Sequence, residues 1–160
     1  MRLQLQTWQD IDTYLTRSRG IMIPIGSTEQ HGPNGLIGTD ALCPEVIAWR
    51  AAEQCGAVVG PPISVGMAQH HLAFSGSITL RPSTLIAMIR DYVVSLARHG
   101  FERFYFLNGH GGNIATVNAA FSEIYAEASL NPGLDRPHIR CKLDNWFGFD
   151  SIAEISAELF

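Results

Sequence analysis

Short apolar runs alternate with longer stretches of helical period along this chain. Strands are predicted at 21–25, 57–63 (a strand and its exit), 77–80, 103–107 and 138–143. The run IMIPI is continuously apolar, which is typical of a strand that is buried on both faces of a sheet. Strands that alternate with helices favour a mostly parallel sheet covered by helices on both sides. The pattern therefore predicts an α/β fold.

The stretches between these runs have the spacing of amphipathic helices. Helices are expected at 39–54, 81–100 and 114–129, and a further one begins at 151–160. Thr39 or Asp40 is expected near the N-cap of the first helix. Gly100 ends the second helix, whose apolar side chains share one stripe. Because the last stretch has no C-terminal helix signal, we expect the chain to be incomplete.

Length and composition indicate one globular domain. The chain has 160 residues, of which 46% are hydrophobic and 16% charged, values that allow a sizeable core. Its apolar runs are far shorter than the ~18 residues of a membrane span. The N-terminus has no apolar segment of signal-peptide length. We therefore expect a cytoplasmic protein without membrane association.

Charge and cysteine content exclude further classes. The net charge is −4, Lys142 is the single lysine, and basic residues do not cluster, so a nucleic acid is not expected as a partner. Cys43, Cys55 and Cys141 are odd in number and form no C-x-x-C pair. We expect them to be reduced thiols that act as small buried hydrophobes.

Acidic and imidazole side chains follow the predicted strands. Glu29 and His31 come after the strand at 21–25, Asp40 opens the next helix, and His110 follows the strand at 103–107. Ligands in open α/β sheets bind beyond the carboxyl ends of the strands. Carboxylates and imidazoles are ligands of divalent metals. Any one of these residues alone is more often structural, but together they predict a metal site.

Glycine surrounds His110 in the segment NGHGGN (108–113), which is expected to form a turn. Gly109, Gly111 and Gly112 permit positive φ values and a close backbone approach around the imidazole. A phosphate-binding loop is the rival interpretation. It is disfavoured because Ile114 occupies the place of the third glycine of G-x-G-x-x-G and no G-K-[ST] follows.

A second pair of imidazoles, His70 and His71, lies in a Gly- and Ser-containing loop. Adjacent loop residues point in different directions, so at most one of the two is expected to face the site. A solvated or hydrogen-bonded loop pair is the alternative. Trp146 and Phe147 likewise either line a pocket or pack in the core.

Three segments in order carry a family resemblance: PIGSTEQHGPNGLIGTD (24–40), HHLAFSGSITL (70–80) and FYFLNGHGGN (104–113). They resemble the signature segments of the creatininase (creatinine amidohydrolase) family. The resemblance implies a three-layer αβα fold with a mostly parallel sheet, a two-metal hydrolase site and commonly a hexamer. It makes Glu29, His31, Asp40 and His110 metal ligands, with Asp40 as the bridging carboxylate.

Two positions depart from the family pattern. Creatinine-cleaving members have a glutamate where this chain has Gly112, and the usual F-P-G-T is replaced by F-S-G-S at 74–77. Creatinine is therefore not expected as the substrate, and the metal shell is one acid short. We expect the chain to be a single creatininase-like domain (1–160) that lacks the C-terminal part of the family fold, where the fifth acid would lie.

The functional hypothesis is a metal-dependent amidohydrolase that cleaves a non-peptide C–N bond of a cyclic or linear small-molecule amide. Two divalent ions (zinc, manganese or iron) would activate water, and His70 or His71 would act as the catalytic proton donor. A homo-oligomer is expected from the resemblance. A non-catalytic creatininase-fold binding protein is the alternative. A metal-dependent phosphoesterase is disfavoured by the scarcity of lysine.

Overall fold

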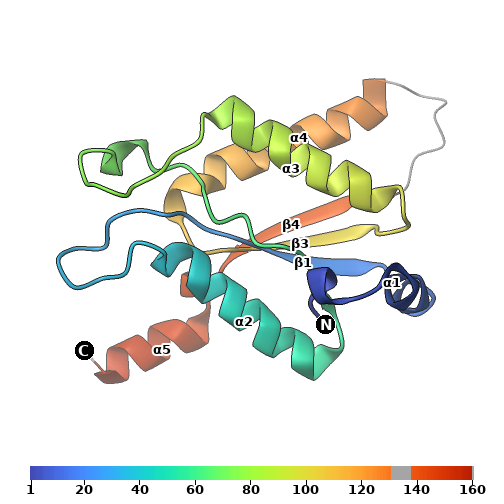
Figure 1. Ribbon diagram of the computed structural model, residues 1–160, viewed down its shortest axis with the longest axis horizontal. Helices are drawn as coiled ribbons and strands as arrows, with labels where there is room; N and C mark the ends of the chain where they lie inside the picture. Colours follow the sequence, from blue (N-terminus) through green and yellow to red (C-terminus); the bar gives the residue numbers. More distant parts are fainter. Residues whose placement is uncertain (131–137, 160) are drawn as a thin grey trace.

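The computed structural model describes residues 1–130 and 138–159 (Figure 1). Its sheet has four parallel strands in the order β2-β1-β3-β4. They are β1 (Gly20–Ile25), β2 (Val58–Val59), β3 (Arg103–Asn108) and β4 (Arg140–Asn145). The predicted parallel sheet is confirmed, and β1 and β3, its two central strands, pair over their whole length.

Helices cover both faces of this sheet. They are α1 (Trp8–Leu15), α2 (Thr39–Cys55), α3 (Pro82–Ala97), α4 (Ile114–Leu130) and α5 (Asp150–Leu159). Figure 1 shows α3 and α4 on one side of the sheet, and α2 and α5 on the other. The predicted helices are thus confirmed with small shifts of their ends, and the three-layer αβα arrangement is present.

The central strands contribute side chains from their two faces to two separate hydrophobic cores. Ile23 and Phe106 are fully buried in the core under α3 and α4. Leu107, the next residue along β3, packs on the other face with Ala48 and Ala52 of α2. Because successive side chains of a strand point to opposite faces, a strand covered on both sides must be apolar throughout. This explains the continuous apolar run at 21–25 and the apolar residues that follow Arg103 in β3.

Two of the predicted strands are corrected. The run 57–63 holds only the two-residue strand β2 and an isolated bridge between Ile63 and Ile25. Pro61 and Pro62 lie in between, and proline has no N–H to donate to a neighbouring strand. The run 77–80 forms no strand, because only Ile78 makes a bridge, to Thr28.

The start of the first long helix also differs from the prediction. Gly38 is the N-cap of α2, and no side chain caps this end. Thr39 lies in the first turn and donates its hydroxyl to the Leu36 carbonyl. Asp40 is not a cap because its carboxylate is engaged by two imidazoles, which are described below.

Helix α1 was not predicted from the apolar pattern. Its N-terminus is a capping box, in which Thr7 accepts a hydrogen bond from the Asp10 N–H and Asp10 accepts from the Thr7 N–H. The spacing T-x-x-D was the available signal. Tyr14, fully buried, fastens this helix to the sheet by donating its hydroxyl to the Gly20 carbonyl at 2.6 Å.

The three cysteines are free, as expected. The prediction that all are buried is wrong for Cys55, which is exposed because it is the last residue of α2, and Cys43 and Cys141 are half-buried. Among the described helices, none combines the length and the apolar content that crossing a membrane requires.

Candidate metal centre

Close backbone contacts bring the first turn of α2 against the carboxyl edge of the sheet. Gly26 follows β1 and Gly109 follows β3, and a Cβ on either residue would lie 2.0 Å from the Asp40 backbone oxygen. Only glycine permits this approach. The carboxylate of Asp40 therefore lies at the edge where the loops after β1 and β3 emerge.

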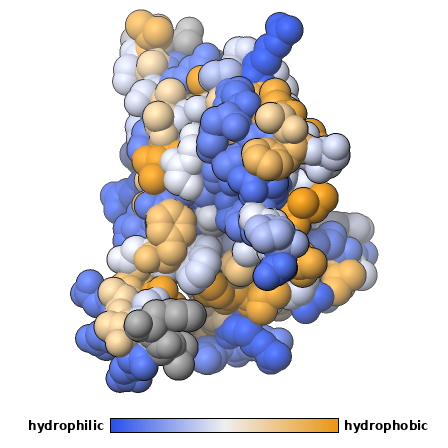
Figure 2. Space-filling view, turned by 90° about the vertical axis from the view of Figure 1, so that its left-hand side faces the viewer, coloured by the Kyte–Doolittle hydropathy of each residue, from blue (hydrophilic) through white to orange (hydrophobic). Residues whose placement is uncertain are grey.

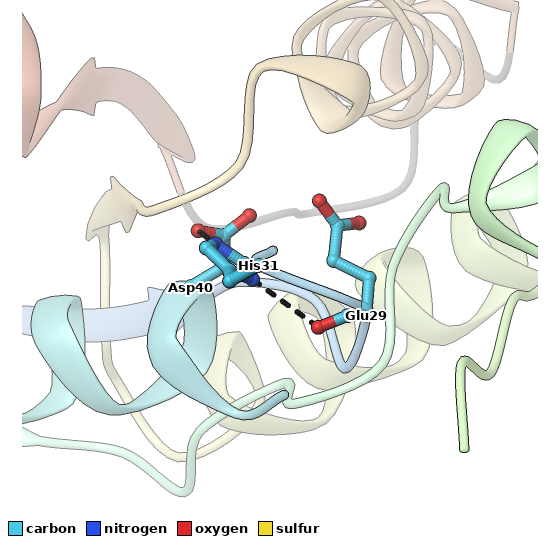
Figure 3. Close-up of side chains that lie close together, drawn as sticks. All are labelled: Glu29, His31 and Asp40. Atoms are coloured by element: carbon cyan, nitrogen blue, oxygen red, sulfur yellow. Dashed lines mark hydrogen bonds and ion pairs between the residues drawn. The ribbon is translucent and has the colours of Figure 1, made fainter. Parts of the chain in front are cut away.

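Asp40 is the centre of a cluster of acids and imidazoles. Its Oδ1 lies 2.9 Å from His31 Nε2, and its Oδ2 lies 2.8 Å from His110 Nδ1. Glu29 Oε1 lies 3.2 Å from the same His110 nitrogen. Ligand atoms of Glu29, His31 and Asp40 all lie within 4.8 Å of one another (Figure 3). The four residues proposed from the sequence are thus neighbours.

Backbone carbonyls fix the tautomers of the two imidazoles that face Asp40. His31 Nδ1 lies 3.1 Å from the Glu29 carbonyl oxygen, as Figure 3 shows. His110 Nε2 lies 2.8 Å from the Met67 carbonyl oxygen. A carbonyl only accepts, so these two nitrogens carry the proton, and in a neutral ring the other nitrogen offers a lone pair. Each oxygen of Asp40 therefore faces an imidazole nitrogen that has a lone pair when the ring is neutral and a proton when the ring is charged.

Electrostatics in this cluster favours a cation between the acceptors. Burial lowers the pKa of His31 and of His110, but the bonds to carbonyl oxygens and to Asp40 outweigh it, so both pKa values are raised. Burial raises the pKa of Asp40, and its two imidazole partners outweigh this and lower it. A proton or a metal ion can neutralise such a set of lone pairs.

Glu29 adds the second carboxylate. The side chain is buried, and Oε2 has no hydrogen-bond partner within the described residues. A buried carboxylate oxygen without a partner is costly unless a cation compensates it. This oxygen and the imidazole lone pairs form a mixed oxygen and nitrogen donor set, which suits zinc, manganese or iron.

Two asparagines, which the sequence analysis did not single out, hold the loops around the cluster. Asn113 is fully buried, accepts from the Met67 N–H, and donates to the Gly26 carbonyl and to Asn108 Oδ1. Asn108 in turn donates to the carbonyl of His110. These residues are the two ends of NGHGGN, so their position in that motif was the only sequence signal.

The glycines of NGHGGN act by close approach and not by positive φ, which corrects part of the prediction. Gly109, Gly111 and Gly112 all lie outside the positive-φ region. A Cβ on Gly112 would lie 2.4 Å from His110 Nε2 and 2.6 Å from the Met67 carbonyl oxygen. Position 112 is therefore glycine because any side chain would separate His110 from the carbonyl that orients it.

The two adjacent imidazoles occupy different environments. His71 Nε2 lies 3.3 Å from Glu29 Oε1, and His71 Nδ1 lies 2.9 Å from Gln30 Nε2. His70 is exposed and stacks over His110, with ring centroids 5.9 Å apart. Both rings are thus near the cluster, and only His71 contacts one of its carboxylates.

The two aromatic residues after β4, Trp146 and Phe147, also lie in different environments. Trp146 is half-buried and packs against the core that contains Leu107 and Ala48. Phe147 is 44% exposed. Of the two interpretations offered by the sequence, core packing therefore describes Trp146 and not Phe147.

Apolar side chains are exposed around the carboxyl edge. Figure 2 shows hydrophobic residues interspersed with hydrophilic ones on the face at this end of the molecule. Leu36 is 71% exposed, and Leu72, Phe74 and Ile78 on the neighbouring loop are each at least half exposed. The mouth of the cluster is therefore partly apolar.

A parallel αβα sheet with an acid and imidazole cluster at its carboxyl edge defines the class of this protein as a three-layer α/β protein with a candidate metal centre. The profile of the creatininase family, described as creatinine amidohydrolase, matches residues 4–160. The chain belongs to the creatininase family.

Several curated proteins are similar in sequence. A mycofactocin precursor peptide peptidase from Mycolicibacterium smegmatis is 35% identical over 106 residues, 62% of this chain and 42% of that protein. A creatinine amidohydrolase from Pseudomonas putida is 32% identical over 113 residues, 67% of this chain and 44% of that protein. A 3-dehydro-scyllo-inosose hydrolase from Thermotoga maritima is 32% identical, covering 68% and 35%. These matches span less than half of each relative.

Solved structures agree with the fold. A structure titled "Creatininase Mn" superposes with a TM-score of 0.88 at 25% identity, covering 99% of this chain and 63% of that chain. A mutant creatininase of Zn-Zn type has a TM-score of 0.88 at 24% identity, covering 99% and 63%. The three-layer fold is therefore that of the creatininases, and this chain spans less than two thirds of their length.

Proposed function

We propose that this protein is a metal-dependent hydrolase that cleaves an amide C–N bond. The observation that carries the proposal is that the two oxygens of Asp40 face two different imidazole nitrogens, His31 Nε2 and His110 Nδ1. One carboxylate would then bridge two cation positions, with Glu29 as a further ligand at the His110 position. Relatives named as an amidohydrolase and as a peptidase support a reaction at an amide.

The chain's own residues hold and orient the ligands. The Glu29 and Met67 carbonyls keep His31 and His110 in the tautomers that present a lone pair. When bound, divalent cations polarise a carbonyl and lower the pKa of a water molecule toward neutral pH. His70 or His71 would deliver a proton to the leaving nitrogen. Zinc, manganese and iron each suit this donor set.

The substrate class proposed is a small amide, cyclic or linear. The atoms around Gly112 leave no room for the glutamate side chain that creatinine-cleaving members carry at this position. Creatinine itself is therefore not the proposed substrate. The peptidase names among the relatives make a peptide bond the competing substrate. A panel of cyclic amides, linear amides and short peptides, assayed with Zn²⁺ and with Mn²⁺, separates the two.

Asp40→Asn is the variant that tests the bridging site. It keeps the size of the side chain, removes the charge and replaces one of the two carboxylate oxygens by a donor, so both ions should be lost and turnover abolished. His31→Ala removes a ligand from one position and should weaken one ion. Metal per chain, measured by elemental analysis, and amide turnover are followed together.

Asp12→Asn is the matched control, because Asp12 is exposed on α1. It should keep the metal content and turnover of the wild type. If Asp40→Asn retains two ions and near-normal turnover, Asp40 is not the bridge and the proposal is wrong. If the wild type binds no divalent metal at all, the metal mechanism is wrong as a whole.

A non-catalytic binding protein is the second candidate, and Gly112 favours it. Glycine at this position adds no carboxylate to the group of potential ligands formed by Glu29, His31 and Asp40. Metal binding without turnover of any amide in the panel would support this candidate.

The oligomeric state and the location stay predictions. We propose a homo-oligomer, on the resemblance and on the exposed apolar side chains Leu36, Leu72 and Phe74. Sedimentation velocity at micromolar concentration tests it, and a monomer would contradict it.

A further inference from the structure

Gln30 connects the Glu29 segment to the neighbouring loop through both atoms of its amide. Gln30 Oε1 accepts a hydrogen bond from the Gly32 N–H at 2.9 Å. Because that N–H can only donate, the oxygen of the amide must face Gly32. The NH₂ group then faces His71 Nδ1, 2.9 Å away. The orientation of this amide follows from its backbone partner.

The amide decides where the proton of His71 lies. An NH₂ group only donates, so Nδ1 of His71 accepts and bears no proton. In the neutral ring the proton is then on Nε2, which lies 3.3 Å from Glu29 Oε1. His71 is only one-fifth exposed, and Glu29 is buried. The protonated nitrogen of His71 is therefore the one that lies within ion-pair distance of the Glu29 carboxylate.

The loop that carries His71 is fastened to the Gln30 segment. The Gln30 N–H donates to Ser77 Oγ at 3.3 Å, and the Ile78 N–H donates to the Thr28 carbonyl at 2.9 Å. The hydroxyl at position 77, where the family usually has threonine, thus has a contact in this chain. These two contacts fasten the segment of Gln30 to the end of the loop that carries His71.

We infer that Gln30 is a positioning residue, which sets the tautomer of His71 so that His71 orients the carboxylate of Glu29. The inference rests on the proposed function in one respect, which is that Glu29 binds a metal ion. His71 uses its Nε2 proton on Glu29, and its Nδ1 is occupied by Gln30. The exposed ring of His70, stacked on His110, is then the imidazole left to act as proton donor.

Nitrogen-15 NMR of the histidine rings tests this tautomer directly. The chain is measured at pH 8, once with Zn²⁺ and once with a chelator, and His71→Gln identifies the His71 signals. In the wild type we expect a protonated Nε2 and an unprotonated Nδ1. Gln30→Glu replaces the donor by an acceptor and should place a proton on Nδ1. Gln30→Met, which has neither, should remove the preference.

Gln69→Met is the matched control, because Gln69 is exposed on the same loop two residues before His71. It should leave the His71 signals unchanged. Calorimetry with Zn²⁺ supplies the second measurement. Gln30→Met should lower the affinity for Zn²⁺ by about tenfold, as is typical when a residue that orients a metal ligand is replaced.

A wild-type Nδ1–H tautomer, or unchanged His71 signals in Gln30→Glu, would overturn the inference. Those signals do not depend on turnover. A chain with the expected tautomer that binds no Zn²⁺ would contradict the proposed function and leave the Gln30–His71 assignment standing. Normal Zn²⁺ affinity in Gln30→Met would show that the tautomer does not serve the metal, and would overturn the positioning role.

Discussion

Replacing Asn113 by alanine should destabilise the whole domain and not only the candidate site. The amide of Asn113 is fully buried and joins three segments that lie far apart in sequence. It accepts from the Met67 N–H at 2.9 Å and donates to the Gly26 carbonyl at 2.9 Å. Alanine would leave both of these backbone groups without their partner in the interior.

The size of the effect follows from these two groups. Each buried polar group that loses its partner costs about 1–3 kcal/mol, so the free energy of unfolding should fall by about 2–6 kcal/mol. A domain of this size has a total stability of roughly 5–15 kcal/mol. With a urea m-value of about 2 kcal/mol/M, a loss of about 4 kcal/mol moves the midpoint by about 2 M.

Urea unfolding, followed by circular dichroism in the presence of a chelator, measures this change without any contribution from metal. Asn118→Ala is the control, since Asn118 is exposed on the same helix α4, and its effect should stay within about 0.5 kcal/mol. Asn113→Asp keeps the acceptor for Met67 and should lie between the two. A midpoint of Asn113→Ala equal to that of Asn118→Ala would refute the reasoning.

Two further predictions concern the motif after β3 and the pH dependence of stability. Gly112→Ala should weaken Zn²⁺ binding by calorimetry, because its Cβ would push His110 away from the Met67 carbonyl; Gly111→Ala, where a Cβ meets nothing within 4 Å, should not. Equal affinities for the two variants would contradict this. Burial and Asp144 raise the pKa of Tyr105 to about 12 from its ordinary value of 10.0. The contribution of Tyr105 to stability is therefore complete below about pH 10 and is lost as the pH rises through about 12. The urea midpoint of Tyr105→Phe should then fall less steeply over this pH range than the midpoint of the wild type. Parallel slopes would show that Tyr105 does not contribute.

Much of the fold could be predicted because the central strands are covered on both faces. Strands β1 and β3 begin or end within one residue of the apolar runs at 21–25 and 103–107. Since parallel strands share one carboxyl edge, the residues that follow them could be placed together. Glu29, His31 and His110 do lie there with Asp40.

The parts that could not be predicted depend on contacts between distant segments. Gln30 and His71 are 41 residues apart, and Asn113 and Gly26 are 87 residues apart. Hydrophobic periodicity carries no information on such side-chain hydrogen bonds. The role of Gly112 was likewise hidden, because it follows from the distance to Met67 and not from the φ angle of the glycine.

The contact of Gly26 and Gly109 with the backbone of Asp40 has a consequence for redesign of this protein. The start of α2 is located by the close approach of Gly26 and Gly109 to the Asp40 backbone, so exposed side chains further along the helix do not set the position of Asp40. Leu42 and Val46, each nearly half exposed on the same helix, can therefore be varied in a library without displacing Asp40. The two glycines must stay constant in every member of such a library.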